Sequence, residues 1–179
     1  MSRKLMMILS LMGVVLFWSS MVSAEALMAG MKASDWSFKD SEGKDNSMAS
    51  WAGKVLFVNY VDPDESDLNE HISDAMKKAK DQGLLKDETY KGIGIADCKA
   101  TWKPDVLIRS IAGSKAKKFN TVILFDYDAT LRAAWGLEID TSNVILLDKN
   151  RIVRVIVRGK VPESEVAAIV QMAIDLQKE

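Results

Sequence analysis

One apolar run, residues 55–61, constrains the fold of this chain more than any other feature. It reads Val-Leu-Phe-Val-Asn-Tyr-Val, so it is rich in β-branched and aromatic residues and lacks the regular polar alternation of a half-exposed strand. A run of this kind predicts a strand that is buried on both faces of a sheet. Such strands are typical of α/β proteins, in which helices cover the sheet.

Helical and strand patterns alternate after this run. Apolar side chains between residues 68 and 79 fall on one helical face, and Asp67 with Glu70 three residues later is typical of a helix N-terminus. We expect this helix to end at Gly83 and to lead into a second strand at 90–97. The pattern therefore predicts a strand–helix–strand unit with two parallel strands.

The second half of the chain predicts the remaining parts of a mixed sheet. Pro104 and Gly113 bracket a short helix, because proline favours the first helical position and glycine commonly follows a helix. We interpret the lysine-rich residues 115–118 as a solvated loop. The other expected elements are a strand at 121–125, a short helix that Gly136 ends, strands at 143–147 and 152–157, and a helix from Pro162. Together they predict an α/β fold with a central mixed sheet and helices on both faces.

Residues 1–24 have the three zones of a secretory signal peptide. Basic residues at 3 and 4 precede an apolar run over residues 5–18, and small and polar residues follow as far as Ala24. The apolar run is shorter than the roughly 20 residues that a membrane-spanning helix needs, and no later stretch is long enough. We therefore expect cleavage after Ala24, a soluble periplasmic protein without a stable membrane span, and a single domain over residues 25–179.

Charge and composition argue against several classes of function. Residues 1–24 hold two of the 24 basic residues and none of the 25 acidic ones, so the remainder has a formal charge of −3 and no nucleic-acid partner is expected. Cys98 is the only cysteine, which excludes an intrachain disulfide. His71 is the only histidine, which argues against a Ser-His-Asp triad and against a zinc site of Cys and His. We expect no catalytic residues of these classes, no metal and no cofactor.

Several segments together resemble the redoxin and peroxiredoxin branch of thioredoxin-like proteins. The resemblance is carried by residues 36–44 and 53–60 at the start, and by residues 123–128, 134–137 and 144–148 later in the chain. More narrowly, the stretch from 107–110 through 135–137 to 147–149 is similar to the YtfJ family of small periplasmic thioredoxin-fold proteins. The resemblance covers nearly all of residues 25–179. It implies a thioredoxin-like fold with a redoxin-type insertion.

The chain departs from that branch at two places that redox chemistry requires. Redox-active relatives have a cysteine where the first buried strand meets its helix, because the helix N-terminus stabilises the thiolate. Here residues 62–67 read Asp-Pro-Asp-Glu-Ser-Asp, and a carboxylate cannot undergo disulfide exchange. The proline expected just before the late strand is also missing, since residues 141–143 read Thr-Ser-Asn. We therefore expect neither dithiol–disulfide oxidoreductase nor peroxiredoxin activity.

The acidic residues Asp62, Asp64, Glu65 and Asp67 form the first part of a candidate surface. One interpretation is structural, because acidic side chains at a helix N-terminus cap its first amides and favour its dipole. The other is a hard cation such as calcium, held by Asp62, Asp64 and Asp67. The segment does not fit an EF-hand loop, since Ser73 stands where that loop closes with glutamate.

Cys98 and Trp102 complete the candidate surface. Cys98 follows the strand at 90–97, at the carboxyl edge where α/β sheets place their ligand crevices. It is either a small buried residue or a reactive thiol whose thiolate Lys99 would favour, without a resolving cysteine. Trp102 lies in a polar loop beside this edge, where it either packs beneath the loop or anchors a partner.

Residues 124–131 resemble the first motif of haloacid-dehalogenase-type phosphatases. In that chemistry Asp126 would be the nucleophile and Asp128 the general acid, with magnesium bound between them and phosphate. Only 53 residues follow Asp126, which is too few for the remaining motifs of those enzymes. An aspartate in such a turn also has a structural use, because it binds its own backbone.

The function that these observations favour is a non-catalytic binding or scaffold role in the cell envelope, with an envelope protein as partner. The α/β framework survives without the residues of redox catalysis, and a fold can exchange one site for another. We expect the binding crevice between residues 62–67, Trp102 and the turn at 142–143. The alternatives are a thiol-redox accessory that acts through Cys98 alone and a phosphatase that acts through Asp126 and Asp128.

Overall fold

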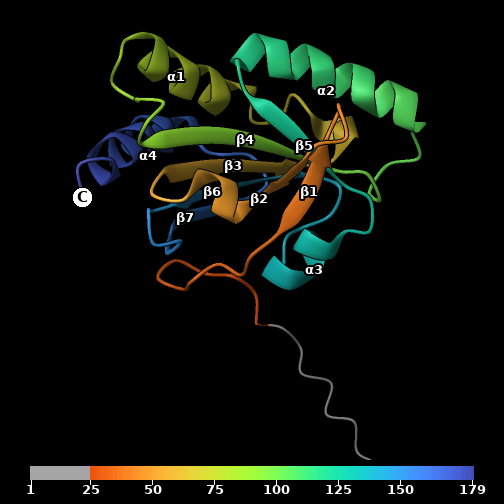
Figure 1. Cartoon of the computed structure of the whole chain (residues 1–179), viewed down its shortest axis with the longest axis horizontal. Coiled ribbons are helices and arrows are strands. Elements are labelled where there is room, and N and C mark those ends of the chain that lie inside the picture. Colours follow the sequence, from red (N-terminus) through yellow and green to blue (C-terminus); the bar gives the residue numbers. More distant parts are fainter. Residues whose placement is uncertain (1–24) are drawn as a thin grey trace, which may run out of the picture.

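The structure, a computed structural model that describes residues 25–179, places the apolar run at 55–61 inside a seven-stranded sheet (Figure 1). The predicted signal peptide lies outside the described residues. The strands are β1 (Ser37–Asp40), β2 (Asp45–Ser47), β3 (Val55–Val61), β4 (Tyr90–Asp97), β5 (Val122–Asp126), β6 (Ser142–Leu147) and β7 (Val153–Arg158). The α-helices are α1 (Glu70–Asp81), α2 (Asp105–Phe119), α3 (Thr130–Trp135) and α4 (Glu163–Leu176), and two short 3-10 helices are η1 (Met48–Trp51) and η2 (Pro63–Glu65).

The strand order is β2-β1-β5-β4-β3-β6-β7. Strands β3, β4 and β5 are parallel, because α1 and α2 carry the chain back between them. Strand β6 is antiparallel to β3 and forms a hairpin with β7, whereas β1 and β2 extend the other side of the sheet as an antiparallel pair. The mixed sheet predicted from the sequence is confirmed.

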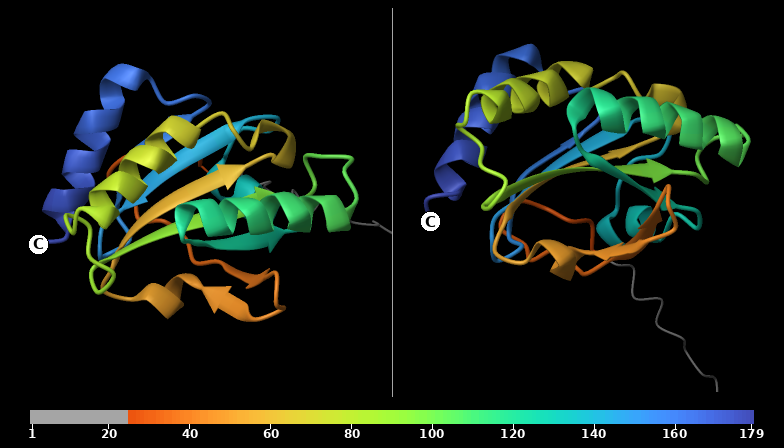
Figure 2. Two further views of the ribbon diagram at one scale, coloured as in Figure 1. Left: turned by 90° about the horizontal axis from the view of Figure 1, so that it is seen from above. Right: turned by 45° about the horizontal axis from the view of Figure 1, so that its top comes forward.

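Helices cover both faces of the sheet. Helices α1, α2 and α4 lie on one face, and α3 lies on the other together with the chain that leads into β1 (Figure 2). No helix among residues 25–179 has the length and apolar character that a membrane crossing requires. This arrangement confirms the predicted α/β fold with a central mixed sheet and helices on both faces.

Helix α2 is longer than the sequence predicts. Gly113 does not end it, because the buried residues Ile108 and Ala112 pack the helix on the sheet and a single helical glycine costs only about 1 kcal/mol. The helix continues to Phe119 and ends at Asn120, which has a left-handed backbone (φ 47°).

The predicted solvated loop at residues 115–118 is therefore the last part of α2. Lys115 forms ion pairs with Asp67 and Glu70, so it links α2 to the start of α1. The sequence suggested that Asp67 caps α1. In the structure the N-cap residue is Asn69 instead.

The two faces of the sheet are packed differently. On the α3 face one cluster of buried residues runs across the sheet and includes Trp36 and Trp135, with Trp51 packed against it. On the other face the buried residues form two separate clusters, one beneath α1 and α4 and the other beneath α2. Strand β4 runs between these two clusters and presents Gly92 and Gly94 there.

Candidate functional site

Each of the three parallel strands delivers an aspartate to the same edge of the sheet. Asp62 follows β3, whereas Asp97 and Asp126 are the last residues of β4 and β5 and lie opposite each other in register. All three are buried, with at most 4% of their surface exposed. A buried carboxylate needs hydrogen-bond or ionic partners, so its partners decide what it can do.

Asp126 holds the N-terminus of α3. Its Oδ1 accepts a hydrogen bond from Thr130 N at 2.9 Å, and its Oδ2 accepts from Leu131 N at 2.9 Å and from the Tyr60 hydroxyl at 3.1 Å. Both oxygens are thus engaged by donors of the fold itself. This geometry argues against Asp126 as a phosphatase nucleophile, and the exposed Asp128 has no part in these hydrogen bonds.

Asp97 forms an ion pair with Arg132 of α3. Burial raises the pKa of Tyr60, and the carboxylates of Asp126 and Asp97 raise it further, so the hydroxyl remains protonated and donates to Asp126. Tyr60 comes from β3, Asp97 from β4 and Arg132 from α3. These buried polar groups therefore connect three elements and act as a structural network.

Asp64 joins the acidic loop at 62–67 to the loop that precedes α2. Thr101 Oγ1 donates a hydrogen bond to Asp64 Oδ2 at 2.6 Å, and Lys103 forms an ion pair with the same carboxylate. Beneath them, Asp62 Oδ1 accepts a hydrogen bond from Asp64 N at 2.8 Å. Burial raises the pKa of Asp62, and neighbouring carboxylates raise it further. The two loops are thus held together at the carboxyl edge.

The proposed cation ligands are not brought together. Asp62 is buried beneath the loop, Asp64 is bound to Lys103, and Asp67 is bound to Lys115 on α2. Among residues 25–179, no group of three or more His, Cys, Asp or Glu side chains is arranged to hold a metal ion. The geometry does not fit the hypothesis of a cation held by Asp62, Asp64 and Asp67.

Cys98 lies just beyond β4 and is half-buried. Its thiol is directed to the carbonyl oxygen of Ala96, at an Sγ–O distance of 3.6 Å. Burial raises the pKa of Cys98 to about 12, and the carboxylates of Asp105, Asp97 and Asp126 contribute to the increase. The sequence suggested that Lys99 would favour the thiolate, but the acidic surroundings and burial favour the neutral thiol instead.

At pH 8, Cys98 should react with a disulfide reagent such as DTNB at least about 100-fold more slowly than free cysteine, because only the thiolate attacks. Below the pKa, the thiolate fraction and the reaction rate should rise roughly tenfold for each pH unit. Stopped-flow absorbance from pH 7 to 10 measures this dependence, and protein unfolded in urea provides the fast control. A native rate at pH 8 that equals the unfolded rate would contradict the assignment.

One of the two sequence interpretations placed Trp102 beneath its loop. The structure shows that Trp102 does not pack there. Its surface is 87% exposed, and Val106, in the first turn of α2, is 80% exposed. The hydrogen bond from Thr101 and the ion pair of Lys103, both to Asp64, fix the residues on either side of Trp102. The loop therefore exposes a large apolar ring to solvent, while the backbone on both sides of the ring is fixed by contacts with Asp64.

The candidate residues thus divide into an inner and an outer group. Asp62 and Cys98 are withdrawn into the edge, whereas Trp102, Asp64 and Glu65 are exposed on it. The turn at 141–143 also reaches this edge, because the Asp62 backbone N donates to the carbonyl oxygen of Thr141 at 3.0 Å. The structure therefore brings together the three segments that the sequence assigned to one edge.

Sequence analysis missed the structural network in which Tyr60 donates to Asp126 and Arg132 pairs with the neighbouring Asp97. A signal for part of it was present, because Asp97 and Asp126 each end an apolar run and Asp62 directly follows one. Aspartates at the ends of neighbouring parallel strands must meet at one edge. The pairing with Arg132 depends on how α3 packs and has no local sequence signal.

Comparisons with known proteins agree with this fold. A family model described as "Bacterial protein of unknown function (YtfJ_HI0045)" matches residues 18–176. An uncharacterized protein of Haemophilus influenzae is 26% identical over 168 residues, which cover 90% of this chain and 90% of that protein.

Solved structures that are described as redox proteins are similar to this chain in fold. The thioredoxin domain of a thiol-disulfide oxidoreductase from Bacteroides vulgatus has a TM-score of 0.62 at 13% identity, and the match covers 83% of this chain and 99% of that chain. A peroxidoxin from Mycobacterium tuberculosis has a TM-score of 0.60 at 12% identity and covers 83% and 97%. At identities this low, the similarity supports the fold alone and does not indicate that this chain has the activity of those proteins. The family match extends over most of the sequence, and the chain belongs to the YtfJ_HI0045 family, with a thioredoxin-like fold.

Proposed function

We propose that this protein is a non-catalytic binding protein of the cell envelope that holds a partner protein at the carboxyl edge of its sheet. Export to the periplasm and a single domain over residues 25–179 are parts of the proposal. The three zones of residues 1–24 support the export. The absence of paired cysteines supports a role without dithiol chemistry, because one cysteine cannot form an intrachain disulfide.

The observation that carries the proposal is the 87% exposure of Trp102 on an anchored loop. Tryptophan is enriched among the few interface residues that contribute most to binding, because it buries a large ring at low entropic cost. Asp64 holds the neighbouring Thr101 and Lys103, so little backbone freedom is lost when a partner covers the ring.

The charge of the same edge indicates the chemistry of the partner. Glu65, Asp105 and Asp128 are exposed there beside one exposed lysine, Lys99, and the buried carboxylates at the ends of β3, β4 and β5 lie behind them. Complementary charge speeds association and selects among partners. The partner segment that fits is basic and carries an apolar side chain that packs on Trp102.

Capture of partners from periplasmic extract tests this proposal. Trp102→Ala should lower the amount of captured protein at least about tenfold, which is an ordinary loss for a central interface tryptophan. Leu84→Ala is the matched control, because Leu84 is also exposed, at 49%, but follows α1 at the other end of the sheet. Equal capture by Trp102→Ala and the unchanged protein would reject the assigned surface.

The alternative of a redox accessory through Cys98 receives no specific support. Its sulfur is half-buried, its pKa is raised to about 12, and its neighbours are carboxylates. Reactive cysteines lie in exposed, electropositive surroundings. We therefore keep the binding role as the single proposed function.

A further inference from the structure

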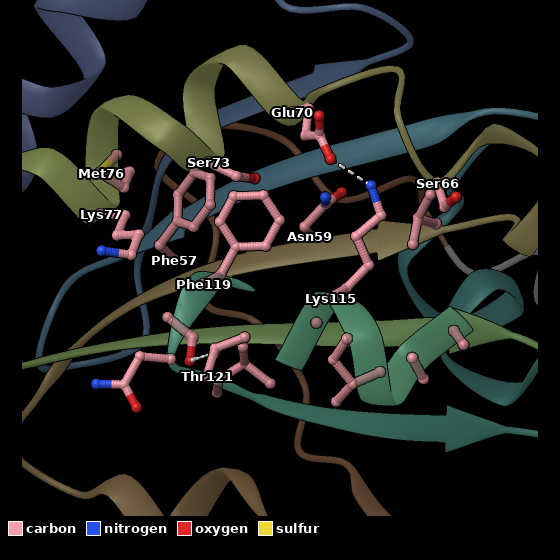
Figure 3. A pocket seen from close by; sticks show the side chains of 18 of the residues that line it. Phe57, Asn59, Ser66, Glu70, Ser73, Met76, Lys77, Lys115, Phe119 and Thr121 are labelled. Atoms are coloured by element: carbon pink, nitrogen blue, oxygen red, sulfur yellow. Dashed lines mark hydrogen bonds and ion pairs between the residues drawn. The ribbon is translucent and has the colours of Figure 1, made fainter. Parts of the chain in front are cut away.

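A cavity of about 110 Å³ lies between α1 and α2, above β4. This volume is several times the roughly 10–15 Å³ that one water molecule requires on the same measure. Figure 3 shows Phe57 and Phe119 turned into this space, while Glu70 from α1 and Lys115 from α2 meet beside Asn59. The cavity is therefore a space between two helices that are joined by an ion pair.

The floor of the cavity is made by β4, which presents two glycines and one alanine there beside the larger Tyr90. Gly92, Gly94 and Ala96 of β4 share this face because strand residues alternate in direction. A Cβ atom at Gly94 would lie 3.0 Å from Cγ1 of Ile123, so that position tolerates no larger residue without adjustment. Glycine weakens a strand interior and often marks the close approach of a ligand. Ile123 therefore lies against Gly94, and the Tyr90 hydroxyl would lie 3.4 Å from a Cβ atom at Gly92. The two glycines make room for these neighbours and form a low floor beside them.

The walls are predominantly apolar. The α1 side is formed by Phe57 and Met76, and the α2 side by Ile108, Ile111 and Phe119. These residues do not merge into one core, because the cluster beneath α1 is separate from the cluster beneath α2. A lining whose walls are mainly apolar is typical of small-molecule sites.

Polar groups are confined to definite places in the lining. Asn59 lies in the middle, and because its Oδ1 accepts from Ser142 Oγ at 2.7 Å, its amide nitrogen is the group that can donate to an occupant. Lys77 and Lys80 lie on α1 at the end away from Glu70. Their partners Asp81 and Asp87 are exposed carboxylates, and exposed ion pairs exchange at little cost.

The net charge of the lining is positive. Among the described residues, four lysines and one acidic residue, Glu70, line the cavity. Outside the lining, Asp81 and Asp87 pair with Lys77 and Lys80, so an anionic group at this end would bind by exchanging with these exposed carboxylates. The apolar walls favour a molecule whose remaining part is a hydrocarbon or an aromatic ring.

We propose that this cavity is a binding site for a monocarboxylic acid with a medium-length hydrocarbon chain. The hydrocarbon chain lies on Gly92 and Gly94 between the walls of α1 and α2, and the carboxylate faces Lys77 and Lys80 at the mouth. The lining reaches Pro63 and Ser66 of the loop at 62–67 but does not include Trp102, and the proposal does not depend on partner binding by Trp102.

Calorimetric titration of the purified protein with octanoate and with octan-1-ol tests the site. Octanoate should bind and raise the melting temperature, because a ligand that binds only the folded state stabilises it. Gly92→Val should weaken octanoate binding at least about tenfold by filling the floor, and it should still fold, since a β-branched residue suits a strand. Gly113→Ala, a glycine substitution outside the cavity, is the matched control and should bind as the unchanged protein does.

The charge assignment has its own test. The double variant Lys77→Gln and Lys80→Gln should weaken octanoate binding about fivefold and leave octanol binding unchanged. No octanoate binding, equal binding of octanoate and octanol, or undiminished binding by Gly92→Val would each overturn the proposal. Trp102→Ala should bind octanoate normally and Gly92→Val should capture partners normally, so failure of one proposal can be told from failure of the other.

Discussion

Replacing Asp126 with alanine should lower the free energy of unfolding by about 3 kcal/mol, because several buried donors lose their acceptor at once. The backbone N–H groups of Thr130 and Leu131 and the hydroxyl of Tyr60 all donate to this carboxylate. Asp126 is 1% exposed, so water cannot replace the missing oxygens without opening the edge. Urea denaturation followed by tryptophan fluorescence measures the change.

Asp128→Ala is the matched control for this substitution. Asp128 lies two residues away in the same turn and is exposed, so its loss should change stability by less than about 0.5 kcal/mol. Similar stabilities for Asp126→Ala and the unchanged protein would show that Asp126 is not a structural residue. The phosphatase interpretation would then need to be considered again.

Trp135→Ala should be the most destabilising single substitution considered, with a loss of about 4 kcal/mol, because it leaves a large cavity in the core. The side chain of Trp135 is completely buried, and its indole Nε1 donates to Ser34 Oγ at 3.0 Å. It belongs to the continuous cluster on the α3 face, together with Leu27 and Leu131.

The comparison for Trp135→Ala is Trp102→Ala, which removes the same side chain from the surface. Because Trp102 is 87% exposed, its loss should change the unfolding free energy by less than about 0.5 kcal/mol. Equal denaturation midpoints for the two variants would contradict the assignment of Trp135 to the core and Trp102 to a binding surface.

Much of the fold could be predicted because its elements have strong local patterns. The strand at 90–97 coincides with β4, and Gly136, with φ at 57°, ends α3 as predicted. The end of α2 was predicted wrongly at Gly113. The interactions that continue this helix are tertiary, since Lys115 reaches Asp67 and Glu70 on another part of the chain.

The candidate edge could be located from the sequence, but the state of its residues could not. Strand ends and loops indicated that Asp62, Cys98 and Trp102 would lie near one another. Whether each is buried depends on contacts distant in sequence, such as those between Asp64 and Lys103. Gly92 and Gly94 were an overlooked signal for the cavity, because glycines inside a strand often mark a place where another molecule approaches closely.

The central claim is that the edge binds a partner through Trp102 and without the thiol of Cys98. The most direct measurement compares partner capture from periplasmic extract by the unchanged protein, Cys98→Ser and Trp102→Ala. We predict that Cys98→Ser captures the same proteins in the same amounts, including under reducing conditions, and that Trp102→Ala loses them. Capture that is abolished in Cys98→Ser and kept in Trp102→Ala would contradict the account and favour a thiol-dependent function.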